Sequence, residues 1–378
     1  MNSIERVFKT IAHEEPDRVP VGEWGIDHDH ISNILGRHTY HRNRKDTTLA
    51  VWQGRRDEAV ESMKRDYSEL IETLDYDVVT VGLVPEKTIT PDPPRKIEDD
   101  IWRDSVGFVY KYCASNDSIV CMTPSPAKEA LTLSEIDAYS ERLLNIDYSQ
   151  FELLDHIVDR FAEKRAVVFR DLDTYGPLIA PFGGDEAHQL MMTIIAPEEI
   201  RKLYDVTIEY NRRLLEYCAG KGVKIVMMGH DYGSTTGCIL SPKTIRELFM
   251  PVNKKIVEAA ENLGITILFH CCGKIWDILG DWIDAGLKGY QSVQVSAGMD
   301  LTTVKKQYGE KLTIWAGIQC ETLIQGTLQQ VEEEVRESLR ICMLGGGFIF
   351  GSTNSVQFGA KTENYLNALN ILRRYGQY

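Results

Sequence analysis

The sequence lacks long apolar runs and an excess of positive charge. No stretch of its 378 residues approaches the ~20 uninterrupted apolar residues that span a bilayer, and the opening MNSIERVFKTIAHEEPDR has no apolar signal-peptide core. The formal net charge is −14, and an acidic surface repels nucleic acid and anionic membranes. We therefore expect a cytoplasmic protein whose main partner is neither nucleic acid nor a membrane.

The sequence also lacks internal repeats, low-complexity segments and a regular spacing of cysteines. Its eight cysteines are scattered along the chain, which indicates reduced thiols rather than the disulfide framework of a small secreted protein. The chain does have length. Because single hydrophobic cores stop growing at roughly 250–300 residues, 378 residues allow one large barrel with additions or two ordinary domains.

Short β-branched runs alternate with longer amphipathic segments from residue 76 onward, the pattern of a parallel sheet with crossover helices. Several runs are apolar on successive residues, as expected for strands covered on both faces. The strand candidates are 77–83, 166–172, 224–229, 265–270, 289–294, 312–317 and 347–352. They predict a (β/α)₈ TIM barrel with its eighth strand near 175–184, and a doubly wound open sheet is the alternative.

Two regions fall outside this alternation. Residues 1–75 show helical periodicity without a clear strand, and 86–145 include an alternating stretch that predicts a β-hairpin with Ser-Asn-Asp as its turn. We expect both regions to cap the mouth of one barrel domain spanning 1–378. A long helix is predicted over 241–264, with a kink at Pro251.

Polar residues follow most of the predicted strands. In a barrel, the loops at the carboxyl ends of the strands form one face, and chemistry occurs there. These strand-end residues are Asp171, Asp173, His230, Asp231, His270, Cys272, Gln294, Gln319, Cys320 and Asn354. Among them, we expect Gln294, Gln319 and Asn354 to bind substrate.

The stretch ITILFHCCGK, residues 265–274, ends an apolar strand in a His-Cys-Cys run. In an extended chain His270 and Cys272 point to the same side, while Cys271 points away. Imidazole and thiolate are usual zinc ligands, so we expect His270 and Cys272 to bind zinc with Cys320, leaving one position for substrate. Alternatively, His270 hydrogen-bonds a backbone carbonyl and the cysteines pack as small apolar residues.

The loop after the strand at 224–229 begins with His230 and Asp231. A carboxylate at that position takes or gives a proton, or orients a substrate hydroxyl. A helix cap or an ion pair is the purely structural alternative. We expect Asp231 and His230 to be catalytic.

The segment GEWGIDHDHI, residues 22–31, is rich in carboxylate and imidazole groups but lacks a regular metal-ligand spacing. It therefore predicts a polar loop in which Glu23 and Trp24 line the mouth of a pocket. Tyr232 adds an aromatic side chain that suits a substrate ring, although such residues also pack in cores.

Five motifs resemble the uroporphyrinogen decarboxylase superfamily, including its corrinoid-linked methyltransferase branch. They are ERVFKTIAHEEPDRVPV, LSPKTIRELFMPVNKKIV, ILFHCCG, WAGIQCETLIQGT and GGGFIFGSTNSVQFGAKTENYLNAL. The resemblance covers nearly the whole chain and implies a (β/α)₈ barrel. True uroporphyrinogen decarboxylases carry R-Q-A-G-R shortly after the first P-V, whereas this chain reads PVGEWGIDHD. Because those arginines are missing, decarboxylation of uroporphyrinogen is not expected.

The methyltransferases that this chain resembles bind zinc through H-x-C and a later cysteine. His270 and Cys272 match H-x-C, but Asn354 occupies the later position, so the third ligand falls to Cys320 or a carboxylate. The resemblance implies methyl transfer between a small methylated compound, such as a methoxylated aromatic, and a corrinoid carried by a partner protein. The alternatives are a decarboxylase of this superfamily with another substrate, and a non-catalytic barrel that holds a ligand or a corrinoid module.

Overall fold

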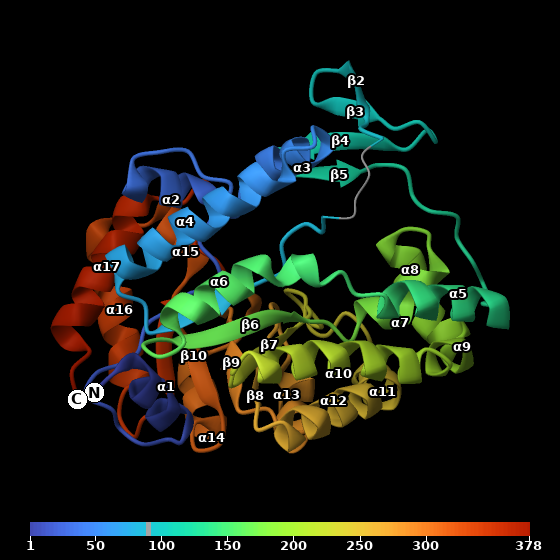
Figure 1. Cartoon of the computed structure of the whole chain (residues 1–378). Coiled ribbons are helices and arrows are strands. Elements are labelled where there is room, and N and C mark those ends of the chain that lie inside the picture. The colour runs from blue at the N-terminus through green and yellow to red at the C-terminus, as the bar shows by residue number, and fades with distance from the viewer. Residues whose placement is uncertain (88–91) are drawn as a thin grey trace.

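The computed structural model describes residues 1–87 and 92–378, and its centre is a curved sheet of seven parallel strands (Figure 1). The strand order is β1-β6-β7-β8-β9-β10-β11. The strands are β1 Val78–Val81, β6 Ala166–Leu172, β7 Ile225–Gly229, β8 Thr266–His270, β9 Gly289–Gln291, β10 Thr313–Ile318 and β11 Phe348–Ser352. All seven predicted strands are confirmed. Because the order runs in one direction, the sheet is barrel-like rather than doubly wound.

A two-residue segment bridges the two edges of this sheet. Val21 pairs with Phe350 of β11 and Gly22 pairs with Val78 of β1, both in parallel. The Val78 N–H donates to the Val21 carbonyl at 3.0 Å, and the Gly22 N–H donates to the Phe350 carbonyl at 3.1 Å. A Cβ at position 22 would lie 2.4 Å from the Val78 carbonyl oxygen, so this close approach requires glycine.

The prediction of an eighth strand near 175–184 is wrong. Helix α7 Gly176–Ile179 and the 3-10 helix η2 Ala180–Phe182 occupy that range, each with a proline in its first turn. Proline favours such positions because its φ is already helical and its missing N–H is not needed there. The bridging segment escapes sequence analysis because two residues are too few to show an alternating pattern.

Helices surround the sheet (Figure 1). They are α1 Ser3–Ile11, α2 His28–Leu35, α3 Arg44–Trp52, α4 Arg56–Leu74, α5 Leu133–Leu144, α6 Glu152–Phe161, α8 Glu186–Ile195, α9 Pro197–Arg201, α10 Tyr204–Gly220, α11 Pro242–Thr244, α12 Met250–Asn262, α13 Trp276–Asp284, α14 Leu301–Tyr308, α15 Cys320–Gln325, α16 Leu328–Cys342 and α17 Thr362–Tyr375. The helix predicted over 241–264 is interrupted by a π-helical turn at Ile245–Phe249, directly before Pro251 in α12. Within the described ranges, no helix is both long and apolar enough to cross a membrane.

The cap over the mouth that the sequence predicted from residues 1–75 is not confirmed. Helix α1 lies at the amino ends of the strands, where its Val7 joins a buried cluster with Val78 and Ala166. The Thr10 carbonyl also accepts a hydrogen bond from Gly347, just before β11. Helix α1 therefore covers the end of the sheet opposite the strand carboxyl ends, with apolar side chains packed against the strands.

The hairpin predicted within 86–145 is confirmed and belongs to a four-stranded antiparallel sheet. Its strands are β2 Arg95–Glu98, β3 Ile101–Arg103, β4 Val109–Cys113 and β5 Ser118–Cys121. The Lys45 N–H of α3 donates to the Asp117 carbonyl at 3.1 Å, and Trp52 packs on Trp102 with ring centroids 5.7 Å apart. Figure 1 shows this small sheet beside α3, away from the parallel sheet. Residues 88–91 of the predicted insertion lie outside the described residues.

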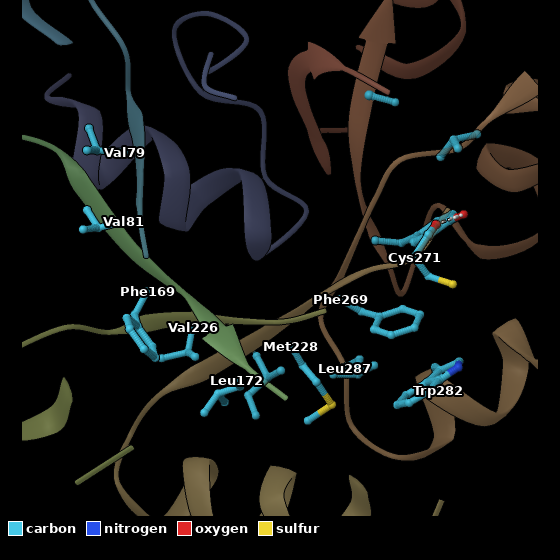
Figure 2. Packing of buried hydrophobic residues seen from close by; sticks show 14 of the residues in the cluster. Val79, Val81, Phe169, Leu172, Val226, Met228, Phe269, Cys271, Trp282 and Leu287 are labelled. Atoms are coloured by element: carbon cyan, nitrogen blue, oxygen red, sulfur yellow. Dashed lines mark hydrogen bonds between the residues drawn. The ribbon is translucent and has the colours of Figure 1, made fainter. Parts of the chain in front are cut away.

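Alternating side chains of the parallel strands divide the core in two. One buried cluster contains Leu268 of β8 with Met227, Trp315 and the α1 residue Val7. The other contains Phe269, whose ring stacks on Trp282 of α13 with centroids 4.2 Å apart, and Figure 2 shows both beside Cys271. Each large apolar side chain buried this way stabilises the fold by roughly 1.5–3 kcal/mol. The same alternation decides where the next residues of β8 point.

Candidate metal centre at the strand carboxyl ends

The side chains at the end of β8 follow the predicted alternation. Cys271 lies in the same cluster as Phe269, and its Sγ accepts a hydrogen bond from the Tyr232 N–H at 3.2 Å. His270 and Cys272 point to the other side, where the His270 Nε2 lies 3.7 Å from the Cys272 Sγ. Ligands of one tetrahedral zinc ion lie roughly 3.6 Å apart, so this separation suits a shared ion.

Gly273 follows β8 by three residues and lies where two loops meet. Its φ is +80°, and a Cβ here would lie 2.3 Å from the backbone carbon of Gly233 in the loop after β7. The Lys274 N–H then donates to the Ser234 carbonyl at 2.8 Å. Only glycine permits this contact between backbones, which holds the β7 and β8 loops together beside His270 and Cys272.

Asp231 adds a carboxylate to this pair. Its Oδ1 lies 3.9 Å from the His270 Nε2 and accepts a hydrogen bond from the Cys272 N–H at 2.7 Å. One ligand atom from each of these residues lies within 4.8 Å of the other two, and they form the only such group found among the described residues. The Asp231 side chain is 52% exposed, so the group opens toward solvent. Nitrogen, sulfur and oxygen donors of this kind fit zinc.

Gln291 of β9 fixes the protonation of the His270 ring. Its Oε1 contacts the His270 Nδ1, while its Nε2 donates to the carbonyls of Ser352 at 3.0 Å and Asn354 at 3.2 Å. Because the amide nitrogen is used on two carbonyls, Oε1 faces the ring, and Nδ1 must carry the proton. The lone pair of Nε2 is then directed to the Cys272 and Asp231 side, the arrangement typical of a metal-binding histidine.

Asn354 contacts the sulfur of Cys272, as its Nδ2 donates to Sγ at 2.9 Å. Ser292 donates more weakly to the same sulfur at 3.7 Å. Burial, followed by the charge of Asp231, raises the pKa of the Cys272 thiol to about 12. A bound cation reverses this preference, because coordination replaces the thiol proton and the two donors then stabilise the thiolate.

Trp24 covers one side of the group. Its ring stacks on the His270 ring, with centroids 4.4 Å apart and planes 5° from parallel. A Cβ at Gly229 would lie 3.3 Å from the edge of the same indole. Trp24 therefore lies beside the group, and its aromatic face restrains the His270 ring.

The side chain of His230 stacks on Tyr175 with ring centroids 3.6 Å apart, and burial lowers its pKa. The His230 backbone N–H donates to the His270 carbonyl at 3.2 Å, which joins the loop after β7 to the end of β8. Tyr232 is buried in the cluster of Phe269 and Trp282, which places it in the core instead of on a substrate-contacting surface.

Glu23 is buried below the mouth and not on its surface. It is 2% exposed and accepts hydrogen bonds from the Ser352 N–H at 2.9 Å and the Ser352 Oγ at 2.6 Å. Burial raises the pKa of the Glu23 carboxyl to about 7, although the Ser352 donors oppose this shift. Glu23 therefore ties the bridging segment to the end of β11.

The remaining predicted residues hold neighbouring loops. The Gln294 Oε1 accepts from the Gly273 N–H at 3.0 Å, and the Gln319 Oε1 accepts from the Val295 N–H at 3.1 Å. Cys320 is buried, and its Sγ contacts Thr353 at 3.8 Å. Its sulfur does not belong to the group of three donors found among the described residues, whereas the carboxylate of Asp231 does.

Sequence analysis missed Gln291 and the strained backbone that follows it. Ser292 and Val293 have φ values of +124° and +52°, which are unusual for residues other than glycine. Such strain persists where surrounding contacts hold it and is frequent at functional sites. The sequence offered little signal for Gln291, because the strand predicted over 289–294 contains several polar residues, and only the structure pairs Gln291 with His270.

A parallel, barrel-like α/β fold with donor groups at the carboxyl ends of its strands defines an enzyme-like class of protein. The model of the uroporphyrinogen decarboxylase (URO-D) family matches residues 183–375, just over half of the chain, and the chain therefore belongs to this family. This confirms the resemblance found in the sequence.

Solved structures add a likeness over the full length. A methyltransferase from Methanosarcina mazei superposes with a TM-score of 0.70 at 15% identity, over 99% of each chain. A putative vitamin-B12 independent methionine synthase from Listeria monocytogenes has a TM-score of 0.44 at 10% identity, over 95% of this chain and 96% of its own. No curated protein matches the chain. At this identity the Methanosarcina likeness establishes a shared fold.

Proposed function

We propose that this protein is a methyltransferase that moves a methyl group between a small methylated compound and a corrinoid carried by a partner protein. The observation that carries the proposal is the convergence of His270 Nε2, Cys272 Sγ and Asp231 Oδ1 at the open end of the strands. The family and the full-length likeness to a methyltransferase support it. A methoxylated aromatic compound is the proposed methyl donor, because an aromatic wall formed by Trp24 borders the group.

The residues present fit a zinc ion, since they offer imidazole, thiolate and carboxylate donors with a histidine of fixed tautomer. His270, Cys272 and Asp231 would hold the ion, which leaves a fourth position for substrate. Bound zinc would act as a Lewis acid on the donor oxygen and make it a better leaving group. Asn354 occupies the position of the later cysteine ligand in the methyltransferases that the sequence resembles. Here it would hydrogen-bond the Cys272 thiolate and would not bind the metal.

Methyl transfer breaks the methyl–oxygen bond of the donor and forms a methyl–cobalt bond with an electron pair from the cobalt(I) of the corrinoid substrate. The leaving oxygen gains a proton to become a hydroxyl. His230 is the proposed source of this proton when Asp231 serves as a ligand, because it directly follows β7 and its backbone is hydrogen-bonded to the His270 carbonyl. Gln294 and Gln319 would keep the surrounding loops in place for the donor.

The corrinoid is large and must reach the donor from outside. In the (β/α)₈ arrangement that we propose, Val21 and Gly22 take the place of the eighth strand, and the strand carboxyl ends form the entrance. The segment around α3, with the small sheet β2–β5 beside it, is the proposed docking rim for the corrinoid protein. Because the chain is acidic overall, this association should depend only moderately on salt.

The test is methylation of cobalt(I) corrinoid protein, followed by its absorbance, with a panel of methoxylated aromatic compounds and the purified, zinc-loaded protein. We expect methyl-cobalt formation with at least one donor, about one zinc per chain, and loss of both in His270→Ala. If zinc is bound but no donor methylates the corrinoid, and methylated corrinoid passes nothing to thiol or folate acceptors, the transferase assignment fails. Release of carbon dioxide from an acidic substrate would instead favour the decarboxylase.

A further inference from the structure

A second group of charged side chains lies at the opposite side of the same strand ends. A cavity of about 270 Å³ opens at the carboxyl ends of β1 and β6. Its walls include residues 82–85, which follow β1, and three arginines from two separate parts of the chain. These arginines are Arg42 and Arg44 at the start of α3, and Arg170 of β6. None of them was singled out by the sequence analysis.

The positive charge of this cavity is only partly neutralised. Arg42 is buried, with a side chain that is 12% exposed, and its Nε donates to Asp27 at 2.7 Å. Arg44 approaches the same Asp27 oxygen at 3.4 Å. The single negative charge of Asp27 therefore neutralises only one of these two guanidinium groups. Burial, followed by the neighbouring positive charge of Arg170, lowers the pKa of Arg42 to about 10, as expected when cations lie close together.

Arg170 has a buried donor that no protein group uses. Its Nη1 donates to the Trp24 carbonyl at 2.6 Å, whereas its Nε is buried without a hydrogen-bond partner in the described part of the chain. The adjacent Asp171 is directed to the Leu83 N–H instead, at 2.5 Å. A buried donor without a hydrogen-bond partner destabilises the fold, so its presence here indicates a ligand atom that the protein itself does not supply.

Trp24 connects this cavity with the candidate metal centre. The guanidinium carbon of Arg170 lies 5.2 Å from the centroid of the indole ring that stacks on His270. His41 also lines the cavity and is buried. Burial, followed by the positive charges of Arg170 and Arg42, lowers the pKa of His41 to about 3, so it adds no charge at neutral pH. A ligand in the cavity therefore meets excess positive charge one indole ring away from the proposed zinc ligands.

We propose that Arg170, Arg42 and Arg44 form an anion subsite that binds the carboxylate of the methyl donor. This inference rests on the proposed methyltransferase function and narrows the donor to a methoxylated aromatic acid. Guanidinium groups suit the task because they bind carboxylates through two parallel hydrogen bonds. The cavity of about 270 Å³ suits a small acidic group, and Trp24, which contacts both Arg170 and His270, lies between this group and the proposed zinc ligands.

The subsite is tested by titration calorimetry of the purified, zinc-loaded protein with 2-, 3- and 4-methoxybenzoate and the corresponding methoxybenzamides. We expect at least one acid to bind ten-fold or more tightly than its amide. Arg170→Gln should weaken binding of that acid at least ten-fold and change binding of the amide less than two-fold. Arg44→Gln, in a more exposed position, should weaken the acid by a smaller factor.

The matched control is Arg340→Gln, because the Arg340 side chain is 70% exposed on α16 and should leave all affinities unchanged. Equal affinity for acids and amides, or an Arg170→Gln protein that stays folded and binds the acid normally, overturns the subsite. Failure of the proposed methyltransferase function gives a different result. Acids would still bind in a manner that depends on Arg170, but the corrinoid would not be methylated. Methylation from amides alone, independent of Arg170, would leave the transferase intact and remove the subsite.

Discussion

Two groups of side chains lie at the carboxyl ends of strands in the same sheet, and they suit ligands of opposite charge. At the ends of β7 and β8, a carboxylate, an imidazole and a thiol converge within 4.8 Å and suit a cation. At the ends of β1 and β6, guanidinium groups surround a cavity and suit an anion. Trp24 contacts both sides. The comparison shows that a strand end fixes where a functional group lies, while the neighbouring charges fix which ligand it takes.

Removal of the Cys272 thiol should give the largest loss of activity and tests the candidate metal centre. We expect Cys272→Ala to lose zinc and to reduce methyl transfer at least about 10³-fold, because a coordinating thiolate is lost. Zinc content and corrinoid methylation are the measurements. The matched control is Cys271→Ala, since that sulfur points into the core. Equal loss of zinc in the control would contradict the assignment of these two neighbours.

Substitution of a glycine on each side should lower the free energy of unfolding by different amounts. Gly273→Ala forces a side chain into a φ of +80° and against the Gly233 backbone, so we expect a loss of about 3 kcal/mol in the free energy of unfolding. Gly82→Ala, on the arginine side, has no positive φ to maintain and meets side-chain atoms of Asp171 and Arg170 instead of backbone. It should cost less than about 1 kcal/mol. Urea unfolding measures both, and equal losses would remove this distinction.

Asp231→Asn should affect turnover and not folding. The side chain is half exposed, and asparagine keeps an oxygen that accepts from the Cys272 N–H. We expect an unchanged melting temperature and a loss of activity of about 10²-fold, the scale for losing a positioned charged group. Asp300→Asn, at the start of α14, serves as a control. A fully active Asp231→Asn protein would limit Asp231 to holding the loop.

The buried acid between the two sides should make stability depend on pH. The pKa of Glu23 is raised from 4.5 to about 7, so its ionisation costs stability as pH rises through this interval, and the loss persists above it. Glu23→Gln removes this cost. We therefore expect the variant to exceed the wild type by about 2 kcal/mol in the free energy of unfolding at pH 8 and to match it near pH 5. A constant difference between these pH values would contradict a buried, neutral carboxyl.

Local patterns in the sequence were sufficient for the parallel strands and for the direction of His270 and Cys272. Runs such as 265–270 are apolar on successive residues, and the two-residue period of a strand separates Cys271 from its neighbours. These predictions succeeded because each depends on a few adjacent residues.

The tertiary structure alone decided which distant residues complete each site. The third donor next to His270 and Cys272 is Asp231 instead of Cys320, because β7 and β8 are neighbours and their loops meet through Gly233 and Gly273. The arginine cavity joins α3 to β6, which are more than a hundred residues apart in the chain. Sequence periodicity describes the environment of one element at a time, whereas these groupings arise from the order in which strands pair and from the burial that the curved sheet imposes.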